Sequence, residues 1–541
     1  MQNPKHIHLI GICGTAMASL AGMLQQQGHR ITGSDAAAYP PMSDQLAALG
    51  IPIHQPYSEA NLTPRPDLVI VGNAISRGNL ELEHVLDHRI PFRSMAAILH
   101  DQFLADRQPL VVAGTHGKTT TTSMLAWIYE VASRTHPAFA PSFLIGGVAE
   151  NFGTSFKVRP VLHDQPAPPF LLEGDEYDTA FFDKGPKFLH YFPQALILTH
   201  VEFDHADIYP DLAAVKTAFK RLVNLVPRSG RIVAFDGSEN VTECITKAFC
   251  PVERYGFSPE SHWQLSNLRH EGTLTHWTLR RNHSPSAPQA TPQATPQPVA
   301  PKPSPGDSPS ANEVLAELTQ ASPQAAPHPA PPNPSRTDSS SASEVFAELT
   351  LPMPGAHNAL NATAAAALAA GQGIPASAIV QALATFQSVK RRLEVRAVIH
   401  NITIIDDFAH HPTAIRETLR ALRESYPAQR LIAVLEPRSN TLRRNVFESE
   451  LIDALALADQ VVLANVFQSE NIPTPERLHP EHIIAALTRR GTPASLHPDA
   501  DAIVASLAPQ LRPGDIVAIL SNGAFGNIYQ KLPTALTLQP L

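Results

Sequence analysis

Short apolar runs alternate with longer amphipathic segments along most of this chain. Residues 6–10 form the first apolar run, and an Ala/Leu-rich segment that ends near residue 27 has the apolar spacing of a helix. Further runs follow at residues 30–35 and 67–71. Strands that alternate with helices are typical of βαβ units, so this part of the chain predicts a parallel sheet with helices packed against it.

A second series of strands follows the first. The apolar residues 110–112 precede a predicted helix that begins at Thr119 and covers residues 119–127, and strands are expected at residues 169–176 and 195–199. The same alternation predicts a parallel sheet with helices on both faces.

A third series begins after two helices. The first helix is alanine-rich and runs from Gly355 to about Ala370, and the second covers residues 377–386. The strands of the third series are predicted at residues 403–406, 431–435, 460–464 and 516–520. At 541 residues, the chain is long enough for two to four domains.

Three domains of α/β class account for these three series. We expect an N-terminal Rossmann-like domain over residues 1–107, a central P-loop-type parallel sheet over residues 108–389, and a C-terminal Rossmann-like domain over residues 390–541.

Residues 283–343 interrupt the central series. They are dominated by Pro, Ala, Ser and Gln, a composition that cannot bury enough apolar surface to order itself, so we predict a disordered insertion. The segment that begins at Pro303 recurs at Pro334, and we expect the second copy to form the working strand because it leads directly into Gly355. Closing a loop of roughly 60 residues costs only about 1 kcal/mol more than closing one of 20, so the fold tolerates the insertion.

Composition narrows the class of protein. The net charge of −8 argues against a nucleic-acid partner and against an anionic membrane surface. The three cysteines have neither metal-binding spacing nor a disulfide framework, which fits a reducing cytoplasm. We expect no signal peptide and no membrane-spanning segment.

The segment Gly114-Thr-His-Gly-Lys-Thr119 lies between the predicted strand and helix of the second series. A strand, a glycine turn and a helix N-terminus bring backbone N–H groups together around an anion. Lys118 adds a positive charge for phosphates, and the Thr119 hydroxyl suits Mg²⁺. The strict P-loop pattern has glycine where Ala113 stands, so this is a shortened variant.

A second glycine turn follows the first strand of the chain. Gly11 and Gly14 precede a helix, and Asp35 ends the next strand about 20 residues later, as in a Rossmann-type nucleotide site. The third glycine of that fingerprint is absent, so an ordinary βα turn is equally compatible with the pattern. Asn73 and Ser76 are expected at the carboxyl edge of the same sheet, where α/β proteins bind ligands.

Six ordered motifs together resemble those of the Mur ligases, the ATP-dependent ligases of bacterial cell-wall synthesis. The motifs span essentially the whole chain apart from the insertion. They are Gly114-Thr-His-Gly-Lys-Thr-Thr120, Glu173-Gly-Asp-Glu-Tyr-Asp178, Asp204-His205, Gly355-Ala-His-Asn-Ala-Leu-Asn361, Arg391-Arg-Leu-Glu394 and Asp406-Asp-Phe-Ala-His-His-Pro412. Within the family, the chain looks most like the members that recycle a tripeptide onto UDP-N-acetylmuramate. The features behind this are Gly11-Ile-Cys-Gly-Thr15, Phe181-Phe-Asp-Lys184, Glu436-Pro-Arg-Ser-Asn-Thr441 and Ser521-Asn-Gly-Ala-Phe-Gly526.

The resemblance implies a site for ATP and Mg²⁺. The phosphates would be bound by Gly114, Thr115, His116, Gly117, Lys118 and Thr119. Mg²⁺ would be held by Thr119, Glu173 and His205. Hydroxyl and carboxylate oxygens suit this ion, whereas His205 rests on the resemblance and has a capping or core role as its alternative. The adenine and phosphates would be faced by His357, Asn358 and Asn361, which otherwise cap the alanine-rich helix.

The resemblance also assigns residues of the third domain. Arg392 would reach the γ-phosphate, and Asp407 would approach the ribose or the metal. His410 and His411 would line the cleft, although either histidine could simply be exposed. The catalytic residues would be Lys118, His205 and Arg392.

Two further groups are expected to bind substrates. The UDP-sugar would be bound by Gly11, Gly14, Thr15, Ser34, Asp35, Asn73 and Ser76. The acceptor peptide would meet Arg438, Ser439 and Asn440 at the end of a third-domain strand. Arginine binds carboxylates through two parallel hydrogen bonds, although pairing of Arg438 with Glu436 is the simpler alternative.

The activity implied by the resemblance is ATP-dependent joining of the tripeptide L-Ala-γ-D-Glu-meso-diaminopimelate to UDP-N-acetylmuramate through an acyl phosphate. A ligase that adds free L-alanine is the nearest alternative. An NAD(P) oxidoreductase is disfavoured by the missing third glycine, and a regulator without chemistry is disfavoured by the presence of Glu173, Asp175 and Glu176. We expect a monomer.

Two departures or options within the family pattern have no assigned role. His200 stands where the family usually has asparagine, which leaves the role of that side chain in doubt. Some relatives carry a carbamylated lysine beyond the Asp-His motif, and Lys216 and Lys220 lie in that region.

Overall fold

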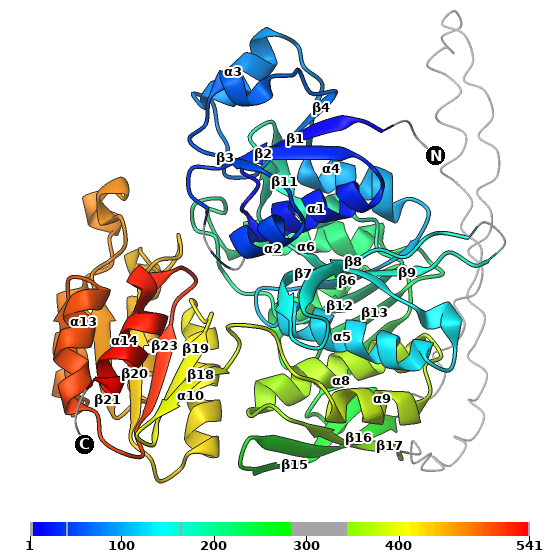
Figure 1. Cartoon of the computed structure of the whole chain (residues 1–541). Helices are drawn as coiled ribbons and strands as arrows, with labels where there is room; N and C mark the ends of the chain where they lie inside the picture. Colours follow the sequence, from blue (N-terminus) through cyan, green and yellow to red (C-terminus); the bar gives the residue numbers. More distant parts are fainter. Residues whose placement is uncertain (1–3, 39, 41, 163–164, 283–342, 539–541) are drawn as a thin grey trace, which may run out of the picture. The chain divides into compact units, whose positions relative to one another are not determined.

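The computed structural model describes residues 4–38, 40, 42–162, 165–282 and 343–538. The chain forms three large sheets, one after another along the sequence, as the colours in Figure 1 show. One small hairpin lies between two strands of the second sheet. The predicted α/β class is confirmed, and the three sheets coincide with the three predicted series of strands.

The first sheet is parallel throughout. It contains, in spatial order, β3 (Ile53–His54), β2 (Arg30–Ser34), β1 (His6–Ile10), β4 (Leu68–Val71) and β5 (Phe92–Ser94). Its helices are α1 (Thr15–Gln26), α2 (Met42–Ala48), α3 (Leu80–Asp87) and α4 (Met95–Leu99). Ile7 and Leu9 of β1 share a core with α1, whereas Ile10 belongs to a separate core with α3. Because successive side chains of a strand point to opposite faces, both faces of the sheet are covered.

The second sheet has ten strands. They are, in spatial order, β17 (Ser343–Leu351), β16 (Leu274–Asn282), β15 (Trp263–Glu271), β14 (Val252–Gly256), β13 (Arg231–Phe235), β12 (Ala195–Leu198), β6 (Gln108–Ala113), β9 (Pro169–Gly174), β7 (Ser142–Ala149) and β8 (Thr154–Lys157). The helices of this region are α5 (Lys118–Ser133), α6 (Leu212–Leu225), α7 (Glu239–Ile245), α8 (Ala356–Gly371) and α9 (Ala376–Ala384). A short hairpin of β10 (Asp178–Ala180) and β11 (Asp183–Pro186) follows β9.

The prediction of a purely parallel second sheet is incomplete. The β15–β16 and β7–β8 pairs are antiparallel and extend the parallel centre on either side. The β15–β16 hairpin turns at Gly272, which has a positive φ of +61°. The burial of β15 alternates along the strand, as expected for a strand with one covered face and one open face.

The third sheet is parallel except for its first strand. It contains, in spatial order, β18 (Glu394–Ile399), β19 (Ile402–Asp407), β23 (Ile516–Leu520), β20 (Leu431–Leu435), β21 (Gln460–Ala464) and β22 (Ala494–His497). The helices are α10 (Pro412–Ser425), α11 (Glu448–Leu455), α12 (Pro480–Arg489), α13 (Ala500–Leu507) and α14 (Ile528–Thr537). The first three helices share one core and the last two another, so this sheet also has two covered faces.

Only the last part of the duplicated segment lies within the described residues. Residues 343–350 of its second copy lie in β17, as expected for the working strand. The first copy and the rest of the predicted disordered insertion lie outside the described residues.

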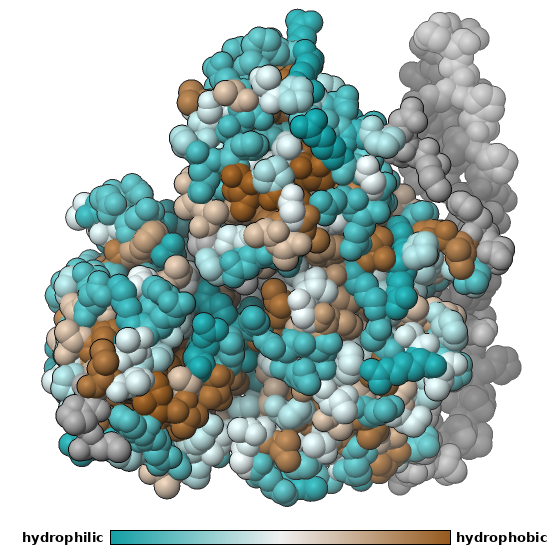
Figure 2. Space-filling model, viewed as in Figure 1, coloured by the Kyte–Doolittle hydropathy of each residue, from teal (hydrophilic) through white to brown (hydrophobic). Residues whose placement is uncertain are grey.

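The surface seen in Figure 2 is largely hydrophilic, with hydrophobic side chains in separate patches. Among the described residues, none of the helices combines the length and apolar character needed to cross a bilayer.

Candidate active site

The turn between β6 and α5 is built on two glycines. Gly114 (φ +135°) and Gly117 (φ +81°) adopt backbone conformations that other residues rarely reach, and a Cβ on Gly114 would collide with the hydroxyl of Thr199. The Thr115 N–H donates to the carbonyl of His200 (2.7 Å), which fixes the turn against the end of β12. Gly117 caps α5, so the free N–H groups of the first helical turn face out of the turn, an arrangement that binds anions.

Lys118 is the first residue of α5 and lies in a buried ionic network. Its ammonium donates to Glu176 Oε2 (2.8 Å) and to the carbonyl of Gly114 (2.7 Å). Burial alone would lower the pKa of Lys118, but the carboxylates of Glu176, Asp175 and Glu173 together raise it. The side chain is therefore a cation that is held at the mouth of the glycine turn.

The acidic residues that face Lys118 come from the end of β9. This strand pairs with β6 so that Gly174 lies opposite Ala113, which places the acids beside the glycine turn. Glu173 accepts from the Thr119 hydroxyl (2.9 Å) and from the Gly146 N–H (2.5 Å), and burial raises the pKa of its carboxyl. The Thr119 hydroxyl and the buried Glu173 carboxylate, with Asp175 nearby, are oxygen ligands of the kind that Mg²⁺ prefers.

His205 lies on the loop after β12 and faces the same acids. Its Nε2 is 3.4 Å from Glu176 Oε1. Burial opposes ionisation of both groups, yet Lys118 and His205 lower the pKa of Glu176 to about 2, and Glu176 raises the pKa of His205. His205 has a φ of +55°, which is uncommon outside glycine and marks a tightly specified position.

One segment of the C-terminal region holds the His205 loop through two adjacent residues, Asn440 and Thr441. Thr441 Oγ1 donates to Asp204 Oδ1 (2.6 Å), and Asn440 Nδ2 donates to Asp207 Oδ2 (2.7 Å). Because Asp204 also accepts the backbone N–H of His205 (2.7 Å), this contact reaches the histidine directly.

Arg392 joins the same cavity from the segment before β18. Its Nη2 lies 3.4 Å from the Thr119 hydroxyl, and its guanidinium is 5.1 Å from the ring centre of Phe408. Arg391 and Leu393, on either side of it, have positive φ values of +64° and +50°, so the backbone here is strained. Burial lowers the pKa of Arg392, and the nearby carboxylates of Asp407 and Glu173 oppose this shift.

These groups line one cavity of about 360 Å³. It brings together most of the predicted phosphate and metal residues, and it also reaches the first sheet. The predicted residues on its wall are Gly14, Thr15, Asn73, Thr115, His116, Gly117, Lys118, Thr119, Glu173, His205, Arg392, His410 and His411.

A second cavity, of about 570 Å³, begins at the other side of the glycine turn. It is lined by the predicted adenine-facing residues His357, Asn358 and Asn361, together with Asp407. Burial lowers the pKa of His357 to about 4, so this imidazole is neutral at pH 7. Asn358 donates to the carbonyl of Pro354 (2.7 Å), and α8 has no side-chain cap, so the alternative capping role is not observed.

The Asp407 carboxylate accepts hydrogen bonds from the protein itself. The donors are the N–H groups of Leu393 (2.8 Å) and Ala409 (2.9 Å) and the Thr418 hydroxyl (3.1 Å). These bonds position the segment that carries Arg392, and the contact with a ribose or metal stays a prediction.

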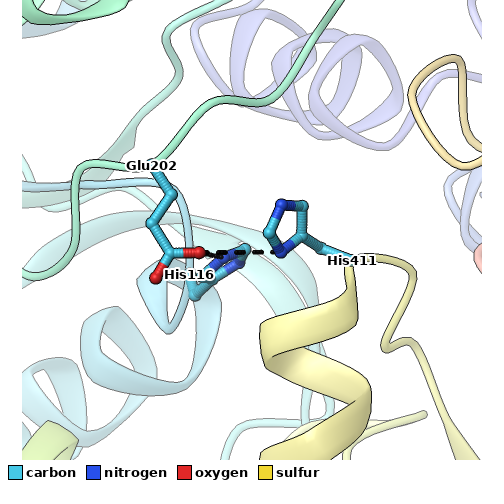
Figure 3. A group of neighbouring side chains, drawn as sticks. All are labelled: His116, Glu202 and His411. Carbon is cyan, nitrogen blue, oxygen red and sulfur yellow. Dashed lines mark hydrogen bonds and ion pairs between the residues drawn. The ribbon is translucent and has the colours of Figure 1, made fainter. Parts of the chain in front are cut away.

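His116, Glu202 and His411 form a contact between the glycine turn and the start of α10 (Figure 3). Glu202 Oε2 lies 3.2 Å from His116 Nε2 and 3.7 Å from His411 Nδ1, and it also accepts from the Thr413 hydroxyl (2.7 Å). His411 caps α10 by accepting the Thr413 N–H, and its Nε2 donates to the carbonyl of Phe203 (3.3 Å). Burial, reinforced by His116, lowers the pKa of His411 to about 3, so the contact is built around a neutral imidazole.

A third cavity lies at the end of β20 and shares His205 and His410 with the first. The predicted acceptor residues Arg438, Ser439 and Asn440 line it. Arg438 lies over the ring of Phe467 (3.8 Å to its centre), and its Nη1 is 3.5 Å from Glu436 Oε1. The alternative pairing with Glu436 is therefore present, but it is long and leaves most of the guanidinium fork available.

Several predicted sugar-binding residues lie apart from these cavities. Ser34 is fully buried, and its hydroxyl donates to Glu81. Asp35 accepts the N–H of Cys13 (2.8 Å), which closes the first glycine turn. Neither residue lines any of the three cavities, nor do Gly11 and Ser76.

Other findings were not expected from the sequence. Lys216 and Lys220 pair with Glu243 at 2.6 Å each and do not line the three cavities. His200 packs against Phe235 on the wall of the second cavity, and burial lowers its pKa to about 4. Lys187 lines the first cavity, but no spacing rule distinguishes it from an exposed lysine in the sequence.

Comparison with known proteins gives one consistent answer. Three family models match the chain: "Mur ligase family, catalytic domain" over residues 6–107, "Mur ligase middle domain" over residues 112–284, and "Mur ligase, glutamate ligase domain" over residues 391–523. Together they cover the first and third sheets and most of the second, in which β17 and the start of β6 lie outside the matched ranges.

Individual relatives agree with these models. UDP-N-acetylmuramate–L-alanyl-γ-D-glutamyl-meso-2,6-diaminoheptandioate ligase from Escherichia coli K12 is 37% identical over 527 residues, which is 97% of each chain. The Haemophilus influenzae protein of the same name is 35% identical over 99% of this chain and 100% of its own. The crystal structure of a murein peptide ligase from Psychrobacter arcticus 273-4 superposes with a TM-score of 0.67 at 31% identity, covering 99% of this chain and 100% of that one. The chain belongs to the Mur ligase family.

Proposed function

We propose that this protein is the ATP-dependent ligase that joins the tripeptide L-Ala-γ-D-Glu-meso-diaminopimelate to UDP-N-acetylmuramate. The observation that carries the proposal is the full-length similarity to ligases named for this reaction, at 35–37% identity. The arrangement of Lys118, Glu173 and Arg392 in one cavity supports it, because phosphoryl transfer depends on positioned charge of this kind.

ATP would bind with its phosphates on the glycine turn and its adenine in the second cavity, beside His357 and Asn361. Mg²⁺ would be held by Thr119, Glu173 and His205, and it would neutralise charge on the phosphates. Lys118 is already desolvated beside the turn and would stabilise the transferred phosphoryl group.

The reaction has two steps. A lactyl carboxylate oxygen attacks the γ-phosphorus, the bond to the β-bridging oxygen breaks, and ADP leaves. The amino group of the peptide then attacks the acyl carbon of the acyl phosphate, and phosphate leaves with the former carboxylate oxygen. Arg392 approaches this site from the C-terminal region, whose contacts with the His205 loop would help to exclude the water that hydrolyses acyl phosphates.

We further propose domain limits of 1–107 for UDP-sugar binding, 108–389 for ATP binding and 390–541 for peptide binding. The protein would act as a monomer in the cytoplasm, in recycling of peptidoglycan peptides.

The acceptor distinguishes this proposal from L-alanine addition. The tripeptide carries carboxylates remote from its reacting amine, and Arg438 offers a guanidinium in the cavity that shares His205 with the first. The test compares kcat/KM for tripeptide and L-alanine in wild type and Arg438→Ala. We expect wild type to prefer the tripeptide strongly and Arg438→Ala to lose about 2–3 kcal/mol of that preference. If L-alanine is the better acceptor for wild type, the function is instead that of the alanine-adding ligase.

A further inference from the structure

Lys187 is a buried lysine on the wall of the first cavity that the roles above leave unused. It lies directly after the β10–β11 hairpin, as the first residue of a short 3₁₀ helix (Lys187–His190). The residue is only 5% exposed. A lysine this deeply buried requires an explanation, because a buried ammonium is costly unless it is paired.

The partners of Lys187 within the described residues are weak ones for a buried cation. Its Nζ lies 3.5 Å from Asp175 Oδ2 and 4.1 Å from the ring centre of Tyr177. Lys118, by comparison, has an acceptor at 2.7 Å and another at 2.8 Å. An ammonium has three donors, so Lys187 retains capacity for an anionic ligand. Consistent with this, burial lowers the pKa of Lys187 even though Asp175 opposes the shift.

The position of Lys187 indicates which ligand that is. Its cavity is lined by Thr15 and Asn73 of the first sheet and, elsewhere on its wall, by Lys118. The hairpin before Lys187 is attached to the first sheet by a hydrogen bond from the Ser94 hydroxyl to Asp183 Oδ2 (3.2 Å). The cavity therefore connects the predicted sugar-nucleotide side to the predicted phosphate side.

A carboxylate that enters this cavity meets an acidic wall. Glu173, Asp175 and Glu176 all line it, so the incoming anion needs a cation that is not already committed. Lys118 is bound to Glu176, and Arg392 lies beside Thr119. The contact of Lys187 with Asp175 (3.5 Å) is longer than that of Lys118 with Glu176 (2.8 Å). Unlike Arg392, Lys187 follows the hairpin that is attached to the first sheet, so it is the cation best placed to take an anion from the sugar-nucleotide side.

We propose that the Lys187 ammonium binds the lactyl carboxylate of UDP-N-acetylmuramate and holds it for attack on the γ-phosphate. This inference rests on the proposed function. An ammonium is a compact donor that can hold one carboxylate oxygen while the other forms the bond to phosphorus. Lys187 remains protonated, and no proton moves in this step.

The test compares a sugar nucleotide that carries the lactyl carboxylate with one that lacks it. UDP-N-acetylglucosamine has a hydroxyl where UDP-N-acetylmuramate carries the lactyl ether, so it lacks the carboxylate. Calorimetry would measure binding of both to wild type and to Lys187→Met. We expect Lys187→Met to weaken UDP-N-acetylmuramate binding by about 10- to 100-fold and UDP-N-acetylglucosamine binding by less than about 2-fold.

Lys184→Met is the matched control. Lys184 belongs to the same hairpin, but its side chain is 68% exposed and pairs with Asp178. Its removal should change neither affinity. Lys187→Arg, which keeps the charge, should retain part of the selectivity for the muramate.

The inference is overturned if Lys187→Met weakens both ligands equally or weakens neither. If Lys187→Met does not fold, as judged by its melting curve, Lys187→Gln replaces it with the same two expected affinities. If wild type itself binds the two sugar nucleotides alike, the proposed function fails, and that result is distinct from a failure of Lys187 alone.

Discussion

The turn after β1 and the turn after β6 both join a buried parallel strand to a helix through two glycines, but their surroundings differ. In the first turn, the Cys13 N–H is taken by the carboxylate of Asp35, and no basic side chain stands within the turn. In the second, Lys118 follows Gly117 and meets the acids of β9. The two turns therefore share a backbone pattern and differ in the charged side chains that converge on them.

The two turns also differ in their tolerance of a side chain. Gly14 has an ordinary φ of −62°, and a Cβ there would find its nearest neighbour at 3.6 Å. Gly114 has a positive φ, and a Cβ there would meet the backbone of His200 as well as the Thr199 side chain. Gly114 is thus fixed by close packing against the end of β12, whereas Gly14 has room. Gly11, the other glycine of the first turn, has a positive φ of +82°, but a Cβ there would find its nearest atom at 3.4 Å.

The largest expected effect comes from removing the charge that distinguishes the two turns. Lys118→Ala should lower kcat by at least about 100-fold, or about 3–4 kcal/mol, since a preorganised charge at the transferred group is lost. Steady-state phosphate release would measure this, and a melting curve would establish that the variant is folded. Near-normal turnover by a folded variant would remove Lys118 from the chemistry.

The next effect compares the glycines directly. Gly114→Ala should lower the free energy of unfolding by about 2–4 kcal/mol, because a positive φ and a collision combine. Gly14→Ala should change it by less than about 1 kcal/mol, because its conformation suits alanine. Denaturant unfolding of both variants would measure the difference, and equal destabilisation would show that the two turns are not distinct in packing.

A smaller expected effect, on the free energy of unfolding, depends on pH. It comes from His411, which contacts the second turn. The folded pKa of His411, about 3, lies below the ordinary histidine value of 6.5, so the unfolded chain gains the proton first as the pH falls. The stability that neutral His411 contributes is complete above pH 6.5 and is lost progressively toward pH 3. At pH 5 the loss should reach about 2 kcal/mol.

His411→Asn provides the control for this pH effect. Asparagine can still cap α10 by accepting the Thr413 N–H but does not titrate. The stability of the variant should therefore fall less than that of wild type between pH 6.5 and pH 5. Parallel curves for the two proteins would show that His411 is not the group responsible.

Local patterns were sufficient to predict much of this molecule. The strands β20, β21 and β23 have the predicted bounds, and the glycine turn was recognisable because strand, turn and helix are adjacent in the sequence. The motif resemblance predicted that Arg392 approaches the glycine turn, and its Nη2 lies 3.4 Å from the Thr119 hydroxyl.

Long-range pairing was not predictable in the same way. Ser34 has a polar side chain at a strand end, but it is buried against Glu81, 47 positions later. Lys187 reaches the first cavity only because the β10–β11 hairpin folds back beside β9, and neither fact leaves a signal in local spacing. The antiparallel strands β15 and β16 were missed because their burial depends on packing with α8.

The central claim is that the lactyl carboxylate is activated as an acyl phosphate. Its most direct test traces a carboxylate oxygen into the released phosphate. The enzyme would receive ATP, tripeptide and UDP-N-acetylmuramate with ¹⁸O in both lactyl carboxylate oxygens, and the released phosphate would be analysed by mass spectrometry. The account predicts that the phosphate carries a labelled oxygen, because the carboxylate oxygen that bonds to the γ-phosphorus leaves with it when the amine attacks. Amide product formed together with unlabelled phosphate would contradict the account.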